Sequence, residues 1–477
     1  MVLGWLESTN FIKAHSALRY PRDDKVVQQH AAQHHSTEPS LGDALISRSW
    51  HGNDWMEPFA HRARVFWELA TEGWGETLCG GGMRWTPHLL VYKNAITNQL
   101  WIAASAKMYL DYPGDGIQSP YSNNREARNL THLESALKGY DWLMNINMTN
   151  SAGLFVDGWH ISRTPANNTK CDEREESVYT YNQGVLLTGQ RGLWEATGSP
   201  DFLRDGHQLI QNVIRATGWD LKRDTPVDEI VPGMLPPWRG IGRVGILEER
   251  CDATGKCSQN GQTFKGIYFH HLNYFCMPIA RTEVDVDDDA FDVVAAAHAK
   301  ACKSYLPWIA YNAKAALTVR DERGVFGEWW GAAMYGDVAE VWDSEEMEYR
   351  RPGWSDYRNF GIPDDGVWAE PGVRVPLAGV EEEHGSDYST PPWYGESGDQ
   401  QRVSWGNKSR KDPNKRGRGR TVETQNSGMA LMRAWWELSQ AYGEKKKSGW
   451  GFAGFGREWL EKLWWLLSVG QSFFSTW

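Results

Sequence analysis

Basic charge is scarce in this sequence. Its 477 residues include 50 Lys and Arg against 61 Asp and Glu, which gives a formal net charge of -11 at pH 7. Phosphate binding needs a basic stripe. The one basic cluster, Lys408 to Arg420, lies in a stretch rich in Gly, Pro and Asn that we interpret as a solvated loop. A nucleic-acid partner is therefore not expected.

The cysteines lack the spacing of metal-binding motifs. Neither a CxxC pair nor a zinc-finger pattern occurs among the six, which are Cys79, Cys171, Cys251, Cys257, Cys276 and Cys302. A metal or another cofactor is therefore not expected. Cys251 and Cys257 flank a turn-rich segment, DATGK, that a disulfide could close.

A membrane-spanning run and a leader-like start are missing as well. The apolar end of the chain, from Leu463 to Trp477, has about 15 uncharged residues, short of the ~20 that a spanning helix needs. The start, MVLGWLESTNFI, has neither the basic region nor the cleavage site of a signal peptide. Asn-x-Ser/Thr sequons favour secretion and glycosylation weakly; they lie at Asn129, Asn147, Asn167 and Asn407.

Aromatic side chains, in contrast, are abundant, with 27 Trp, 18 Tyr and 15 Phe. Half-exposed Trp and Tyr commonly line sugar clefts, because their flat rings stack on the C–H faces of a sugar while their N–H and O–H groups bond its hydroxyls. A Trp-rich core explains any single Trp equally well. The aromatic content therefore favours a carbohydrate ligand without identifying its site.

Helical periodicity dominates the chain. Apolar residues recur at spacings of three and four in Asn94 to Tyr109, and Leu133 to Met144 and Gly184 to Ala196 show the same pattern. Within LWEATGSPDFL, Gly198 follows the end of one helix and Pro200 lies in the first turn of the next. Repeated helix–turn–helix units predict an all-α toroid of helical hairpins.

The chain divides into one large unit and a tail. We assign residues 1–442 to the helical domain and interpret 381–420 as a flexible insertion, because it is polar, charged and rich in Gly and Pro. Helix is expected again from Thr421 to Tyr442. The tail, 443–477, has no assigned role, and a monomer is expected.

Three clusters mix polar and aromatic residues. They are CGGGMRW at Cys79 to Trp85, followed by YKNAITN; the turn at Asp157; and YTYNQG at Tyr179 to Gly184. Adjacent glycines let the backbone approach a ligand or another segment closely, and neutral Tyr, Asn and Gln groups suit sugar hydroxyls. Plain loops, an Asx-turn and an Asn helix cap explain the same residues without any function.

Taken together and in this order, the motifs resemble glycoside hydrolase family 76, the endo-α-1,6-mannanases, and its fungal members in particular. The matching phrases are CGGGMRW, YKNAITN, the DG of VDGWH, YTYNQGVLLTG, FKGIYFHHL and TQNSGMALMRAWWEL. The resemblance implies an (α/α)6 barrel and a retaining hydrolase of α-1,6-linked mannan, with a polysaccharide as its partner. The candidate substrate-binding residues are Gly81, Gly82, Trp85, Asn94, Asn98, Asp157, Tyr181, Asn182 and Gln183.

The resemblance also implies a catalytic pair of adjacent aspartates at the start of an inner helix, one a nucleophile and one an acid/base. Two residues, an aromatic residue and an apolar helix follow such a pair. The matching helix here is MVLGWLE, which begins after the place of the pair. We therefore expect a barrel that is incomplete at its N-terminus, and a catalytic pair and signal peptide that lie upstream of Met1.

Two other carboxylate groups are alternatives for the pair. Asp23 and Asp24 are adjacent, but no aromatic-apolar helix follows them. Asp54 and Glu57 flank Trp55. Glycosidic cleavage needs a proton donor and a nucleophile or base, and retaining enzymes hold the two about 5–5.5 Å apart.

Three other functions stay open. A transglycosylase that passes mannan or GPI glycans to the fungal cell wall differs only in its acceptor, and a catalytically inactive mannan-binding protein needs no aspartate pair. A sugar isomerase needs acid/base histidines, and the one adjacent pair, His270 and His271, lies in the helix-like FKGIYFHHL, where packing explains it. The expected location is secreted or associated with the cell wall.

Overall fold

The computed structural model describes residues 1–19, 53–86, 91–121, 125–162, 167–253, 255, 257–281, 288–335, 414 and 419–443. Asp23 and Asp24, most of the expected insertion at 381–420, nearly all of the tail at 443–477 and the side chain of Asp54 lie outside these residues. Within the described residues most of the regular structure is helical.

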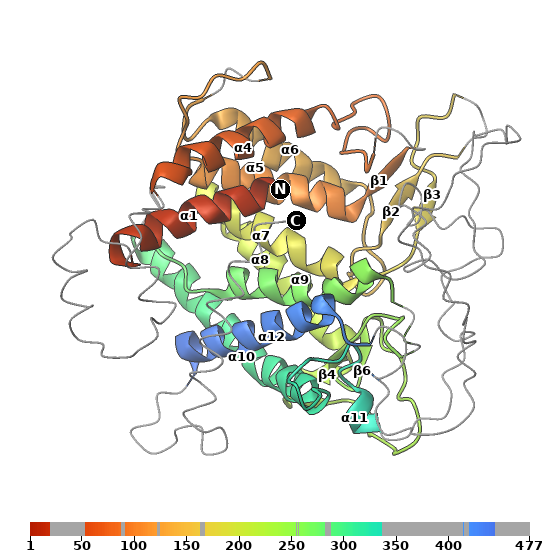
Figure 1. The fold of residues 1–477 in the computed structure, drawn as a ribbon. Coiled ribbons are helices and arrows are strands. Elements are labelled where there is room, and N and C mark those ends of the chain that lie inside the picture. The colour runs from red at the N-terminus through yellow and green to blue at the C-terminus, as the bar shows by residue number, and fades with distance from the viewer. Residues whose placement is uncertain are drawn as a thin grey trace, which may run out of the picture.

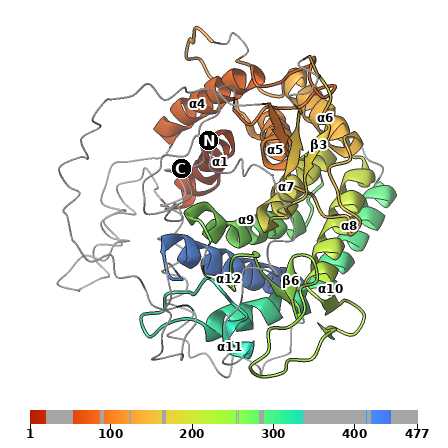
Figure 2. The same cartoon turned by 90° about the vertical axis from the view of Figure 1, so that its right-hand side faces the viewer.

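The helices form two curved layers, one inside the other (Figure 2). The inner layer holds α1 (Val2–Arg19), α5 (Ala95–Asp111), α7 (Thr180–Thr197), α9 (Gln259–Cys276) and α12 (Val422–Tyr442). The outer layer holds α4 (Asn53–Thr71), α6 (Leu130–Asn145), α8 (Pro200–Ala216) and α10 (Asp288–Thr318). Each inner helix contacts the next one in chain order, and the outer helices pack behind them.

This arrangement confirms the prediction of an all-α fold of helical hairpins. The described residues supply five inner and four outer helices of the ring, fewer than the twelve of a complete (α/α)6 barrel. The short helix α11 (Ala332–Tyr335) contacts α10 and is not one of the ring helices.

Short strands lie at the end of the ring where the inner helices begin (Figure 1). An antiparallel sheet is formed by β1 (Tyr92–Asn94), β2 (Gly158–His160) and β3 (Glu173–Glu175), in that order. Two smaller hairpins pair β4 (Trp219–Asp220) with β5 (Thr225–Pro226) and β6 (Gly242–Arg243) with β7 (Ile246–Leu247). Because β1 runs directly into α5, the sheet fixes the loops at the end of the ring where the inner helices begin.

Local sequence signals set the helix ends. Asn94 caps α5 by accepting a hydrogen bond from the Thr97 backbone N–H at 3.2 Å. Gly198 ends α7 with a left-handed φ of 72°, and Pro200 occupies the first turn of α8. The turn predicted from LWEATGSPDFL is therefore confirmed.

Glycines let α7 pack closely on both of its inner neighbours. A Cβ at Gly184 would lie 2.6 Å from the Cα of Tyr268 on α9, and a Cβ at Gly189 would lie 2.8 Å from the Ile102 side chain on α5. Neither distance is compatible with a larger residue. The glycines of YTYNQGVLLTG thus serve the packing of the inner layer.

Three disulfides use all six cysteines. They join Cys79 to Cys171, Cys251 to Cys257 and Cys276 to Cys302. The second confirms the bond expected around the segment DATGK. The first crosses 92 residues and ties the CGGGMRW loop to the segment before β3.

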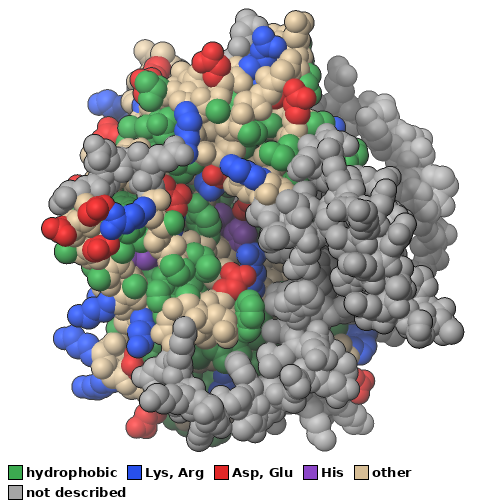
Figure 3. Space-filling view, turned by 90° about the vertical axis from the view of Figure 1, so that its left-hand side faces the viewer, with side chains coloured by type: hydrophobic (Ala, Val, Ile, Leu, Met, Phe, Trp, Pro, Cys, Tyr) green, Lys and Arg blue, Asp and Glu red, His purple; other side chains and the backbone are tan. Residues whose placement is uncertain are grey.

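The end of the ring where the inner helices finish carries mixed charge (Figure 3). On this face Lys and Arg side chains lie scattered among acidic and hydrophobic ones rather than in a stripe. Every helix in the described part of the chain is too short or too polar to cross a bilayer.

Candidate substrate-binding site

Asp157 is the centre of the candidate site, at the N-terminal ends of α5 and α7. Its carboxylate accepts hydrogen bonds from the Tyr92 hydroxyl, from Asn182 Nδ2 at 3.1 Å and from the Tyr181 hydroxyl at 3.4 Å. Its backbone oxygen accepts from the Ala95 N–H at 2.7 Å. Residues from three segments of the sequence therefore meet at one buried carboxylate.

Both phenols that bond Asp157 stay neutral donors. Burial, reinforced by the negative charge of Asp157, raises the pKa of Tyr92 and of Tyr181 well above the usual value. Gly158, the second residue of the DG motif, is required by the sheet, because a Cβ there would lie 2.6 Å from the Cα of Asn94. The motif thus combines a polar anchor with a close strand contact.

Aromatic rings flank the carboxylate and are partly exposed. Tyr181 stacks on Phe264 of α9, with ring centroids 4.0 Å apart and an angle of 26° between the planes. Trp85 meets Tyr92 edge to face at 6.2 Å. Trp85, Tyr181 and Phe264 are half-buried. Exposed ring area beside neutral hydroxyl donors is a suitable surface for a sugar.

The glycines of CGGGMRW pack against the protein itself. Gly82, with a φ of 85°, lies so close to the Trp142 ring that an added Cβ would come within 2.5 Å, and Gly81 is similarly tight at 2.9 Å. The Trp142 indole N–H donates to the Cys79 carbonyl at 3.1 Å. Both glycines are buried. Gly81 and Gly82 therefore let the loop pack directly against Trp142 of α6.

Two of the predicted site residues hold loops in place. The Asn98 amide accepts from the Met83 N–H at 2.7 Å and donates to the Met83 carbonyl at 3.2 Å. The Gln183 amide bonds the N–H and the carbonyl of Phe155 in the same way, at 2.8 Å each. Both amides are fully buried. They act as positioning residues for the CGGGMRW loop and for the segment that carries Asp157.

Two buried charged groups near the site were not predicted from the sequence. Lys93 lies beneath the glycine loop, where its Nζ donates to the Gly82 carbonyl, and burial lowers its pKa to about 8. Glu249 follows β7, and its side chain lies against the first residue of α7. Its Oε1 accepts hydrogen bonds from the Thr180 N–H at 2.9 Å and from the Thr180 hydroxyl. Lys93 is the one charged residue of YKNAITN and lies within strand β1, whereas Glu249 stands between Glu248 and Arg250, where no sequence signal distinguishes it from its neighbours.

Glu249 is expected to make stability fall with rising pH. Burial raises its pKa from 4.5 to about 8, with the charge of Asp252 adding to the effect. Between these values the folded state keeps a proton that the unfolded chain has lost, so the free energy of unfolding decreases as pH rises through this window. The variant Glu249→Gln keeps both bonds to Thr180 and does not titrate.

Urea unfolding from about pH 5 to about pH 9 checks this. We expect a flatter pH dependence for Glu249→Gln than for the wild type, and a more stable variant at the alkaline end. Parallel curves for the two proteins would show that Glu249 titrates normally in the folded state.

Asp54 and the pair of histidines, the alternative catalytic groups within the described residues, do not belong to the cluster around Asp157. Asp54 is in the first turn of α4, whose opposite end leads to the glycine loop, and the 19 residues of α4 span about 28 Å. His270 pairs with Glu7 of α1 at 3.4 Å. His271 bonds the Thr188 hydroxyl at 2.6 Å, and burial lowers its pKa to about 3. The two histidines thus connect inner helices.

Comparisons with known proteins agree on one family. The profile of glycosyl hydrolase family 76 matches residues 52–348. The mannan endo-1,6-alpha-mannosidase DFG5 of Saccharomyces cerevisiae is 25% identical over 236 residues, which cover 48% of this chain and 42% of the yeast protein. A putative mannan endo-1,6-alpha-mannosidase of Schizosaccharomyces pombe is 22% identical over 220 residues, or 45% and 40% of the two chains. The match therefore spans less than half the length of these relatives.

Two solved structures are also similar to this chain. The GH76A alpha-1,6-mannanase from Salegentibacter sp. HEL1_6 is 19% identical with a TM-score of 0.39, over 61% of this chain and 64% of that one. Dfg5 from Chaetomium thermophilum, in complex with glucosamine, is 20% identical with a TM-score of 0.36, over 57% and 53%.

Proposed function

Because the chain belongs to glycosyl hydrolase family 76, we propose that it is the helical barrel of a glycoside hydrolase acting on α-1,6-linked mannan. The fungal relatives are named as mannan endo-1,6-alpha-mannosidases, which supports this substrate. The observation that carries the proposal is the Asp157 carboxylate held by neutral Tyr and Asn donors beside half-buried rings.

We assign the substrate contacts to those site residues whose side chains are partly exposed to solvent. Trp85 and Tyr181 offer ring area to a mannose unit, while Asp157 orients the Tyr181 hydroxyl from behind. Asn94, Asn98, Asn182 and Gln183 are buried and support this surface. Stacking on C–H faces and neutral hydrogen bonds do not require a catalytic pair, so binding and hydrolysis are separable in this chain.

Replacing Tyr181 by Ala is expected to weaken binding of α-1,6-mannotetraose roughly 2- to 10-fold, the range for loss of one ring contact. Tyr181→Phe is the matched control, because it keeps the ring on Phe264 and loses only the hydroxyl bond to Asp157. Isothermal titration with the mannan oligosaccharide and with an α-1,4-glucan of equal length measures both affinity and selectivity. Equal affinity for the two glycans, or for wild type and Tyr181→Ala, would contradict the proposal.

We place the protein in an oxidising compartment, secreted or at the cell wall. Three disulfides use every cysteine of the chain, and such bonds persist outside reducing compartments. Hydrolysis and transglycosylation differ in the acceptor alone, so products formed from mannan with and without an added acceptor glycan distinguish the two activities.

A further inference from the structure

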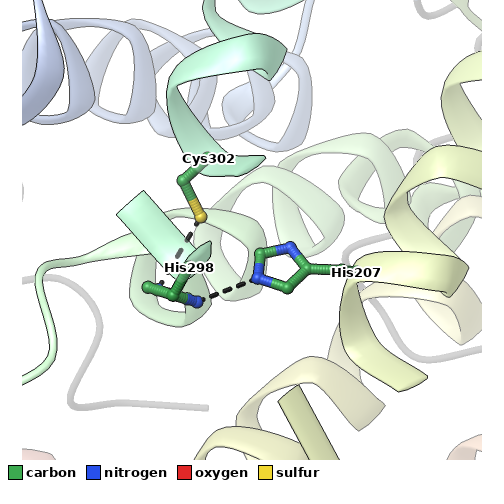
Figure 4. Close-up of side chains that lie close together, drawn as sticks. All are labelled: His207, His298 and Cys302. Atoms are coloured by element: carbon green, nitrogen blue, oxygen red, sulfur yellow. Dashed lines mark hydrogen bonds between the residues drawn. The ribbon is translucent and has the colours of Figure 1, made fainter. Parts of the chain in front are cut away.

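The cluster of His207, His298 and Cys302 has the composition of a metal site but is used in packing (Figure 4). His298 directs one ring nitrogen to His207 Nε2 at 3.0 Å and the other to Cys302 Sγ at 3.7 Å. Opposite nitrogens of one ring cannot bind the same ion, and the sulfur is already bonded to Cys276. These side chains therefore join α8 to α10.

The asparagines of two sequons, in contrast, are exposed at the surface. Neither Asn147 nor Asn167 hydrogen-bonds another described residue through its side chain. Asn129 is half-buried, and its Oδ1 accepts a hydrogen bond from the Thr131 N–H at 2.9 Å as the cap of α6. Asn407 lies outside the described residues. Since an N-linked glycan is bulky and polar, it requires an amide that faces solvent, as Asn147 and Asn167 provide.

Asn147 lies in the turn that follows α6. It has a left-handed φ of 56°, a conformation that asparagine adopts more readily than most residues. The next residue, Met148, is buried, and its carbonyl accepts a hydrogen bond from the Val156 N–H at 2.9 Å. The chain is therefore anchored at Met148, while Asn147 is exposed beside the segment that leads to Asp157.

Asn167 lies on the loop between β2 and β3. The amide of the next residue, Asn168, donates to Asp172 Oδ2 at 2.8 Å. The Thr169 carbonyl accepts a hydrogen bond from the Cys79 N–H at 2.8 Å, which ties the sequon to the glycine loop. The loop is thus fixed around the sequon, and Asn167 stays exposed at its start.

We propose that Asn147 and Asn167 each carry an N-linked oligosaccharide, with Thr149 and Thr169 completing the two acceptor motifs. The inference rests on the secreted location proposed above, where a lipid-linked oligosaccharide diphosphate is the donor. In the transfer, the asparagine Nδ2 forms a bond to the anomeric carbon of the first sugar. The bond from that carbon to the diphosphate breaks, the diphosphate leaves with the electron pair, and one amide proton goes to a base of the transferring enzyme.

The test reads the modification on the full chain, produced in a glycosylating yeast behind a cleavable leader. Enzymatic release of N-linked glycans in heavy-oxygen water converts each modified asparagine to a labelled aspartate, which peptide mass spectrometry locates. Protein that the cells retain is recovered from their membranes and analysed in the same way. A failure of secretion therefore contradicts the proposed location and leaves this readout intact, and a labelled chain that binds no mannan contradicts the proposed function alone.

We expect the label at both asparagines, and the loss of one glycan from each of Asn147→Gln and Asn167→Gln, seen as a step in gel mobility. Thr169→Ala keeps Asn167 but removes its motif, so it should lose the same glycan. Asn145→Gln is the matched control, because Asn145 is exposed two residues before Asn147 and belongs to no sequon. An unlabelled Asn147 or Asn167, or a glutamine variant with the mobility of the wild type, overturns the proposal at that residue. The label is read on the wild-type chain, so the test stays decisive even where a variant does not fold.

Discussion

A chain extended ahead of α1 by a helical segment that begins with two adjacent aspartates is expected to hydrolyse α-1,6-mannan, and to do so ~10²–10⁴-fold faster than the same extension with two asparagines. That range is the usual contribution of a positioned acid/base, and the nucleophile adds a covalent route that the asparagine version cannot use. Release of reducing ends from mannan measures the rates.

The length of the extension follows from how the inner helices are staggered. Val2, the first residue of α1, belongs to the same buried cluster as Trp101 and Ala104, which lie in the second and third turns of α5. Two further turns of helix ahead of Val2 would rise about 11 Å. They would extend α1 toward the end of the ring where the inner helices begin and where the strands beside Asp157 lie (Figure 1).

The asparagine extension is the matched control, since it has the same length and lacks only the ionisable groups. The chain without any extension is expected to match it. Hydrolysis by the unextended chain at the rate of the aspartate version would place the nucleophile within the present sequence, and Asp23, Asp24 and Asp54 would become the groups to substitute.

Local sequence signals predicted the helical part of the fold because they act over a few residues. The apolar pattern from Asn94 to Tyr109 matches α5, and Gly198 with Pro200 marked the turn between α7 and α8. The same reasoning missed α10, a 31-residue helix with Pro307 inside it. Proline removes a backbone donor, so a helix that continues past it depends on tertiary packing.

Pairings between distant residues could not be predicted. The bond between Cys251 and Cys257 spans a short turn, whereas Cys79 and Cys171 are joined across 92 residues by the approach of the glycine loop to the sheet. Six cysteines allow many connectivities, and the fold alone selects among them.

The candidate site, like the fold, was predictable from the sequence only in part. The sequence predicts Asp157, Tyr181 and Asn182 as polar site residues near aromatics, and their side chains meet in the structure. An amide that will bond a sugar and one that will bond a neighbouring backbone look alike in sequence, so the loop-holding role of Gln183 required the structure. The role of Glu249 also required the structure, because its raised pKa comes from burial of the carboxyl group against the start of α7.

Replacing Lys265 by Met is expected to lower the free energy of unfolding by about 3–5 kcal/mol, the usual cost of leaving one member of a buried ion pair alone. Lys265 Nζ donates to Asp252 and to the Glu328 carbonyl at 2.6 Å, and it lies 4.9 Å from the centre of the Trp330 ring. Both side chains of the pair are almost fully buried.

The pH dependence of that loss identifies its cause. Burial raises the pKa of Asp252 to about 6 even beside Lys265, and removing the ammonium raises it further. Asp252 then binds a proton at lower pH and no longer leaves a bare charge in the interior. We expect the deficit of Lys265→Met, measured by urea unfolding, to shrink from about pH 8 to about pH 5.

The double variant Lys265→Met/Asp252→Asn is the matched control, because it removes the charge and keeps the side-chain volumes. It should recover most of the stability that Lys265→Met loses and show little pH dependence, since buried pairs replaced together often cost nothing. A double variant no more stable than Lys265→Met would instead assign the loss to the bond with Glu328 and the contact with the Trp330 ring.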